Sequence, residues 1–196
     1  MFENLTIEQY NQLLASKAPT PGGGSALAIV ATVACSLVEM ALNVTLNKLS
    51  EDSDYYHYLT SERDYASRAK KALYKLANDD ASAFQHIMDC LHMKKDTAEE
   101  QKLRTQELQK AYHKSAIVPL DVMGICNEMT KRAKLRVLDK LNKYVASDCV
   151  IAIDLFGAVA KNSLVNVYAN TAFLTDESLK ARLEKQGEQL LAEIEK

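Results

Sequence analysis

Pro19-Thr20-Pro21-Gly22-Gly23-Gly24-Ser25 is the stretch that decides the fold, and it runs directly into the apolar segment 26–44. The two prolines prevent a helix immediately before the glycines, because each ring fixes φ and keeps the preceding residue out of the α region. The three glycines allow unusual backbone conformations and let a partner approach the main chain closely. Ser25 is a good N-cap residue, so we expect a helix to begin there.

This helix start permits two interpretations. Free N–H groups at a helix N-terminus can bind a carboxylate or a phosphate, and Gly22, Gly23, Gly24 and Ser25 would then contact a ligand. Alternatively, the stretch is a tight connector that lets two helices pack closely. The stretch alone does not separate these readings, because no strand precedes it and no Walker lysine follows it.

The composition is typical of one globular domain, which we place at residues 1–196. The formal charge is -2, with acidic and basic residues interspersed, so we expect no nucleic-acid partner. The cysteines lie far apart and form no C-x-x-C pair, which predicts buried thiols in a reducing cytoplasm and no metal site. The four are Cys35, Cys90, Cys126 and Cys149.

The apolar segment 26–44 approaches the length of a membrane span, which needs roughly 20 apolar residues. However, it is rich in alanine and contains Thr32, Ser36, Glu39 and Asn43. The N-terminus is acidic and lacks the apolar core of a signal peptide. We therefore expect a buried helix, covered by other helices or by a second subunit, and no membrane association.

Helix signals recur along the chain, whereas no window alternates with period two as a strand would. Thr6-x-x-Gln9 and Thr97-x-x-Glu100 are capping boxes. Pro119 should kink or restart a helix, and Asn142-Lys143 should mark a break. The predicted fold class is all-α, a dimeric single-domain bundle of long antiparallel helices. The expected helices cover 7–17, 25–47, 53–92, 97–117, 119–140, 144–173 and 176–195.

Asp80 stands in the apolar stripe of the expected helix 53–92, between Leu76 and Ala83 at helical spacing. Burial disfavours a charged carboxylate, which raises its pKa unless a cation lies nearby, and such groups often act as acids or bases. The alternative is a buried ion pair that fixes the register of the helices.

Further polar residues follow the same helical spacing. In the expected helix 144–173, Asp148 and Asn166 lie on one face, and Asn170 stands one turn beyond. Buried amides need hydrogen-bond partners, so these residues either join helices or bind a polar ligand. Ser147-Asp148 could instead cap the helix. Lys48, close to the end of the expected helix 25–47, is either favoured by the helix dipole or neutralises a carboxylate.

Five blocks of sequence occur in an order that resembles one family, the cyclodeaminase domain of formiminotransferase-cyclodeaminase with its stand-alone bacterial relatives, described as methenyltetrahydrofolate cyclohydrolases. The blocks are Ala18 to Ser25 with the helix ending in Asn43, Thr45 and Lys48; Asp80-Ala81-Ser82-Ala83-Phe84; Lys95 to Glu100 with Arg104; Val118-Pro119-Leu120; and Asn142 through Ser147-Asp148 to Asn166-Val167 and Asn170.

The resemblance implies an all-helical homodimer that binds a tetrahydrofolate derivative as its substrate and needs no metal or redox cofactor. It implies either release of ammonia from 5-formiminotetrahydrofolate, giving 5,10-methenyltetrahydrofolate, or interconversion of the methenyl and 10-formyl forms by water. A formiminotransferase partner is possible in the first case. The sequence leaves open which reaction is preferred.

The resemblance also implies roles for individual residues. Asp80 would be the acid/base, and Lys48 would stabilise charge near it or meet a carboxylate of the ligand. The helix start at Gly22 to Ser25 would bind an anionic or carbonyl part of the folate. The remaining expected binding residues are Asn43, Asn142, Ser147, Asp148, Asn166 and Asn170.

The chain departs from the family pattern at four positions, two of which, Leu49 and Ser50, replace the basic and aromatic residues that follow the lysine. Asn78 stands two residues before Asp80, where the family usually has a second acid, and Asn47 replaces the glycine before the lysine. The alternative function is therefore a non-catalytic protein that binds a folate-like ligand or a partner protein.

Overall fold

The computed structural model describes residues 2–196, and every regular element in that range is a helix, so the predicted all-α class is confirmed. The short helices η1 (Phe2–Asn4) and α1 (Ile7–Leu14) come first. Five longer helices follow: α2 (Gly23–Leu46), α3 (Asp54–Leu91), α4 (Ala98–Arg132), α5 (Ala146–Thr171) and α6 (Glu177–Ile194).

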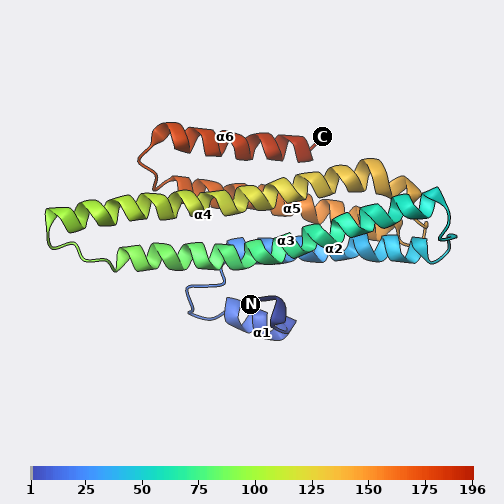
Figure 1. Cartoon of the computed structure of the whole chain (residues 1–196), viewed down its shortest axis with the longest axis horizontal. Helices are drawn as coiled ribbons and strands as arrows, with labels where there is room; N and C mark the ends of the chain where they lie inside the picture. The colour runs from blue at the N-terminus through green and yellow to red at the C-terminus, as the bar shows by residue number, and fades with distance from the viewer. Residues whose placement is uncertain (1) are drawn as a thin grey trace.

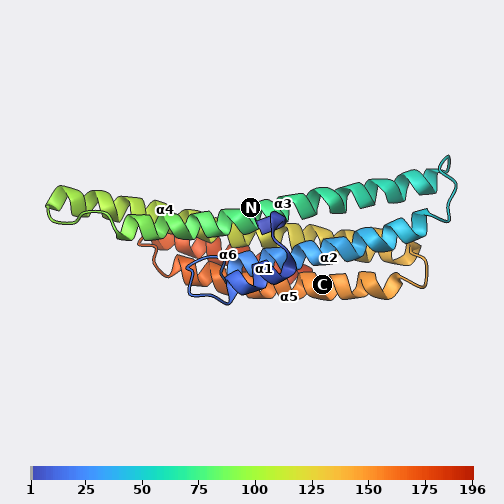
Figure 2. The same cartoon turned by 90° about the horizontal axis from the view of Figure 1, so that it is seen from below.

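The helices α2 to α5 form a four-helix bundle in two layers. Helix α2 packs against α3 and α5, and α4 packs against the same two helices. In Figure 1 the pair α3 and α4 lies in front of the pair α2 and α5, and α6 covers α4 and α5. The connected ends of α3 and α4 extend beyond the other helices as a hairpin tip (Figure 2). This tip has a small core of its own, formed by Ile87, Cys90 and Ala111.

Helix α2 is the most apolar helix and lies in the bundle core. Its small residues Ala28, Ala31 and Ala34 are fully buried, which lets neighbouring helices approach closely. By length and hydropathy α2 and α5 could each cross a membrane, a criterion that the core helices of bundles also meet. Half of the most apolar window of α2 is buried inside this bundle.

Three of the expected helix boundaries need correction. Helix α2 begins at Gly23 with Gly22 as its N-cap, so Ser25 lies inside the first turn and the prediction that it caps the helix was wrong. The expected helices 97–117 and 119–140 are one helix, α4, which continues through Pro119. It then widens through η2 (Ala133–Val137, a π-helical turn) and tightens through η3 (Leu138–Lys140, a 3-10 turn).

Other boundaries agree with the sequence signals. Both capping boxes are present, at Thr6 and at Thr97. The chain leaves helical geometry between η3 and α5, so the break expected at Asn142-Lys143 is confirmed. The position of this break matters for the site. The chain turns there at one end of the bundle, and α5 then runs along α2.

Candidate active site

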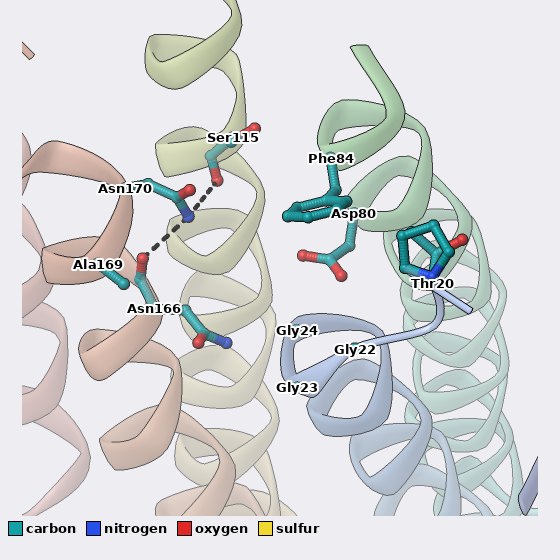
Figure 3. A pocket seen from close by; sticks show the side chains of 11 residues that line it. Thr20, Gly22, Gly23, Gly24, Asp80, Phe84, Ser115, Asn166, Ala169 and Asn170 are labelled. Atoms are coloured by element: carbon teal, nitrogen blue, oxygen red, sulfur yellow. Dashed lines mark hydrogen bonds between the residues drawn. The ribbon is translucent and has the colours of Figure 1, made fainter. Parts of the chain in front are cut away.

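A cavity of about 270 Å³ lies where the start of α2 meets the middle of α3 and the C-terminal part of α5 (Figure 3). It combines bare backbone with polar side chains and one aromatic ring. Its lining consists of Pro19, Thr20, Gly22, Gly23, Gly24, Asp80, Phe84, Ser115, Asn166, Ala169 and Asn170. The structure therefore brings together six of the residues expected at the site: the three glycines, Asp80, Asn166 and Asn170.

Asp80 is held by the first turn of α2. Its Oδ2 accepts a hydrogen bond from the Ser25 backbone N–H at 2.8 Å and lies 3.0 Å from the Ser25 hydroxyl. Burial raises the pKa of Asp80, and the hydrogen bonds from Ser25 offset only part of that shift. A carboxyl with a raised pKa that faces a polar cavity holds its proton more readily than an ordinary aspartate, so it is suited both to donate and to accept a proton.

Gly24 is required by the close approach of this carboxyl. A Cβ atom added at Gly24 would lie 2.6 Å from Cγ of Asp80 and closer still to Oδ1. Its backbone φ is ordinary, so the need for glycine here is one of space and not of conformation. The expectation of a bare backbone against a partner group therefore holds, with the carboxyl of the chain itself as the close group.

Pro119 gives the opposite wall of the cavity its geometry. Proline has no N–H, so the carbonyl of Ser115, four residues earlier in α4, receives no helical hydrogen bond from it. The Asn170 side-chain amide donates to that carbonyl at 3.3 Å and to the Asn166 carbonyl at 2.9 Å. The proline thus frees the acceptor that orients an amide of the cavity wall (Figure 3).

Sequence reasoning missed five lining residues as site residues: Pro19, Thr20, Phe84, Ser115 and Ala169. Phe84 lies one helical turn after Asp80 and is 41% exposed, with its ring at the cavity. Ser115 is buried, and its Oγ has no hydrogen-bond partner within the described chain. The spacing of four residues from Asp80 could have indicated Phe84, whereas no sequence signal indicated Ser115.

Comparison with known proteins agrees with this arrangement. A family model described as formiminotransferase-cyclodeaminase matches residues 6–189. The chain belongs to the formiminotransferase-cyclodeaminase family. The resemblance derived from the five sequence blocks is therefore confirmed.

Individual members of the family match nearly the full chain. The methenyltetrahydrofolate cyclohydrolase of Methylorubrum extorquens is 33% identical, over 98% of this chain and 92% of that protein. The formimidoyltransferase-cyclodeaminase of Sus scrofa is 26% identical over 91% of this chain, which spans 32% of that longer protein. The crystal structure of formiminotetrahydrofolate cyclodeaminase from Thermotoga maritima superposes with a TM-score of 0.86 and 29% identity, covering all of this chain and 92% of the other.

The other residues that the family resemblance suggested lie at the opposite end of α2. Helix α2 has 24 residues, so its ends are about 36 Å apart at 1.5 Å per residue. Lys48 follows the C-terminal end, where its Nζ lies 5.8 Å from the centre of the Tyr144 ring. The remaining members of this distal group are Asn43, Asn142, Ser147 and Asp148. Within one chain the expected pairing of Lys48 with Asp80 is therefore absent.

Some members of the distal group have defined positions and contacts within the chain. The Asn142 backbone N–H donates to the Thr45 hydroxyl at 3.0 Å, which joins the start of α5 to the end of α2. Asp148 lies in the first turn of α5, where a carboxylate is favoured by the helix dipole. No side chain caps this helix, so Ser147-Asp148 is not a capping pair.

Asn78, which stands where the family usually has a second acid, contacts the N-terminal segment. Its Oδ1 accepts the Phe2 backbone N–H at 3.0 Å, and its Nδ2 donates to Glu3 at 2.9 Å and to the Tyr74 carbonyl at 2.9 Å. Asn78 does not line the cavity. In this chain the position holds η1 against α3.

Proposed function

We propose that this chain is a folate one-carbon enzyme that forms or opens the five-membered ring of 5,10-methenyltetrahydrofolate, with Asp80 as its acid/base. The single observation that carries the proposal is the half-buried Asp80 carboxyl with a raised pKa, the only titratable group among the lining residues of the cavity. Membership of the family supports the substrate class.

The chemistry needs one group that changes its protonation state twice. In ring closure a folate nitrogen attacks the formimino carbon and loses a proton, and the leaving nitrogen gains protons and departs as ammonia. In ring opening, water attacks the methenyl carbon and loses a proton, and a ring nitrogen is protonated as its bond to that carbon breaks. Both reactions pass through a tetrahedral carbon, and one carboxyl can serve both transfers. We therefore propose that no metal or redox cofactor takes part.

The remaining cavity groups suit a flat heterocycle rich in donors and acceptors. The ring of Phe84 offers an apolar plane beside Asp80. The amides of Asn166 and Asn170 offer donors and acceptors on the facing wall. We propose that the folate lies between these two walls.

The test is the absorbance band of methenyltetrahydrofolate, followed with purified protein. Appearance of the band from 5-formiminotetrahydrofolate together with ammonia identifies a cyclodeaminase, and accelerated loss of the band from the methenyl compound identifies a cyclohydrolase. Asp80→Asn should lose at least about 100-fold in kcat with the folate Kd retained. A wild-type protein that binds the folate and changes neither band would support the binding-protein alternative instead.

We also propose that the chain works as a homodimer joined through the layer of α2 and α5. This layer leaves an apolar surface exposed, including Val33 of α2 at 51% and Ile151 of α5 at 50%. The α2 stripe repeats at heptad spacing through Val30, Val33, Leu37, Met40 and Val44. Exposed surfaces of this kind in globular proteins mark interaction sites.

An antiparallel arrangement of two such layers explains the separation of the site residues. A two-fold axis perpendicular to the middle of α2 would place the distal group of one chain beside the cavity of the other. Lys48 of the partner could then supply the positive charge that the cavity of a single chain lacks. The homodimer thus reunites residues that the family resemblance assigns to one site.

We also propose a partner protein and a cellular location for this chain. Two-part relatives carry formimidoyltransferase and cyclodeaminase names together. If this chain is a cyclodeaminase, we propose that a formiminotransferase supplies its substrate. The free buried cysteines agree with action in the cytoplasm.

A further inference from the structure

The hydroxyl of Ser25 lies between two oxygen atoms. Its Oγ is 2.8 Å from the Ala77 carbonyl oxygen and 3.0 Å from Asp80 Oδ2, and the side chain is fully buried. A serine hydroxyl has one hydrogen atom, whereas a carbonyl oxygen can only accept. The hydroxyl therefore donates fully to one of the two oxygens at a time.

The ionisation of Asp80 decides which oxygen receives the hydrogen. When Asp80 is ionised, the hydroxyl donates to Oδ2, since a bond to a charged acceptor is stronger than one to a neutral carbonyl. When Asp80 is protonated, its carboxyl can donate to Ser25 Oγ while the hydroxyl turns to the Ala77 carbonyl. Both states are then satisfied without moving any heavy atom.

We propose that Ser25 is a positioning residue whose rotating hydroxyl holds the Asp80 carboxyl in both protonation states and stabilises the ionised state more strongly. This proposal rests on the proposed acid/base role of Asp80. It changes the expected role of Ser25, because its hydroxyl serves the catalytic carboxyl and not the substrate. The backbone N–H of Ser25 holds Oδ2 in the same place throughout.

The charged surroundings of Asp80 leave Ser25 as its main polar partner. Tyr10 of α1 faces it, and burial together with the charge of Asp80 raises the pKa of that phenol, so Tyr10 stays neutral. On α3 the neighbouring Asp79 pairs with Lys75 at 2.6 Å. From α2, α4 and α5 the cavity receives backbone, hydroxyl and amide groups among the described lining residues.

The test compares the ionisation of Asp80 in wild-type protein and in Ser25→Ala, without any folate. The carboxyl carbon of Asp80 can be followed by NMR in protein labelled at aspartate, with Asp80→Asn identifying its signal. We expect the pKa of Asp80 to rise by roughly 1 unit in Ser25→Ala, because the ionised form loses a charge-assisted hydrogen bond. The acidic limb of the kcat/KM profile should move by the same amount. An unchanged pKa would overturn the proposal.

Two further variants guard against misfolding and local helix effects. Ser25→Cys keeps a weak donor of similar size, so its Asp80 pKa should lie between those of wild type and Ser25→Ala. Ser82→Ala removes a hydroxyl that donates to the Asn78 carbonyl at 2.9 Å, and it should leave the Asp80 pKa unchanged. Failure of the proposed function would appear separately, as wild-type protein without folate turnover, whereas the NMR result needs no turnover.

Discussion

At the scale of single residues, the cavity depends on the absence of a Cβ atom at Gly24. Gly24 leaves room for the Asp80 carboxyl, and the backbone one residue further on binds it. The proposed acid/base group is therefore positioned by main chain, which has no side-chain rotamer to change. Such a carboxyl is ready for proton transfer before the substrate arrives.

Gly24→Ala should displace Asp80 and lower kcat/KM by at least about 10-fold, because even small misplacement of a catalytic group is costly. Steady-state assays on the methenyl band check this. Gly23→Ala provides the comparison, since a Cβ there would meet only Asn166 Oδ1, at 4.0 Å. Equal losses in the two variants would contradict a specific contact between Gly24 and Asp80.

Asp80 should also make stability depend on pH. Because burial raises its pKa in the folded state, the folded protein binds more protons than the unfolded chain, and stability falls as pH rises. The loss begins above the ordinary aspartate pKa and is complete above the raised one. Asp80→Asn should therefore gain melting temperature relative to wild type across that window, measured from about pH 4 to pH 7. A difference that is constant with pH would argue against a raised pKa.

At the scale of elements, α4 contains an interior proline, and the hydrogen bond missing there helps to build the site. An interior proline removes a hydrogen bond from the helix and is usually found at its ends. Here the Ser115 carbonyl is taken up by Asn170 from the neighbouring helix α5. The helix therefore continues through Pro119, and the interruption orients a side chain at the cavity.

Pro119→Ala should stabilise α4 and weaken the site at the same time. The new N–H would compete for the Ser115 carbonyl, and Asn170 would lose one of its two acceptors. We expect a gain of about 1 kcal/mol or more in unfolding free energy, with a several-fold rise in the folate KM and little change in kcat. Combining it with Asn170→Ala should add little further to KM, since both variants remove one contact. Full additivity would refute the link.

At the scale of the whole molecule, the bundle separates the expected site residues into two groups at opposite ends of α2. The exposed layer of α2 and α5 lies between them. Assembly through this layer would connect the groups, so the oligomeric state and the activity should change together.

Val33→Glu should convert the proposed dimer into monomers, because it places a charge in the centre of the proposed interface. Light scattering after size-exclusion chromatography measures the mass. Leu103→Glu is the matched control, since Leu103 on the hairpin tip has the same exposed fraction of 51%. A Val33→Glu protein that keeps the wild-type mass would exclude this interface.

Mixing two inactive variants should restore activity if Lys48 acts across the dimer. Asp80→Asn and Lys48→Ala chains, unfolded and refolded together, would form heterodimers with one intact site each. Random pairing predicts about a quarter of the wild-type activity. Recovery of none of it, with both variants folded and dimeric, would place Lys48 outside the site.

The sequence predicted the positions of the helices better than it predicted how the helices contact one another. Capping boxes and apolar periodicity are local signals, so the ends at Thr6 and Thr97 were found correctly. Pro119 misled the prediction, because its compensation comes from Asn170, a residue 51 positions away in the printed sequence. The N-cap was placed three residues late, at Ser25 instead of Gly22, since a glycine cap carries no side-chain signal.

For the site, the family resemblance assigned roles to residues that helical spacing alone could not assign. Asp80 was found from its apolar surroundings, but its contact with Gly24 and Ser25 depends on how α2 crosses α3. Ser115 escaped notice because a lone serine in a helix has no distinctive pattern. The distance between Lys48 and Asp80 follows from the length of α2 once both residues are placed, whereas the arrangement of a second subunit is absent from any one-chain pattern.

The reactivity of the buried cysteines would report which part of the helical bundle opens. Cys35 and Cys126 lie in the main core, and burial raises the pKa of Cys35 to about 12, so neither thiol can react while the bundle is closed. Cys90 belongs instead to the small core of the hairpin tip. A thiol reagent would reach Cys90 whenever the tip alone separates, and the other two only when the bundle itself comes apart.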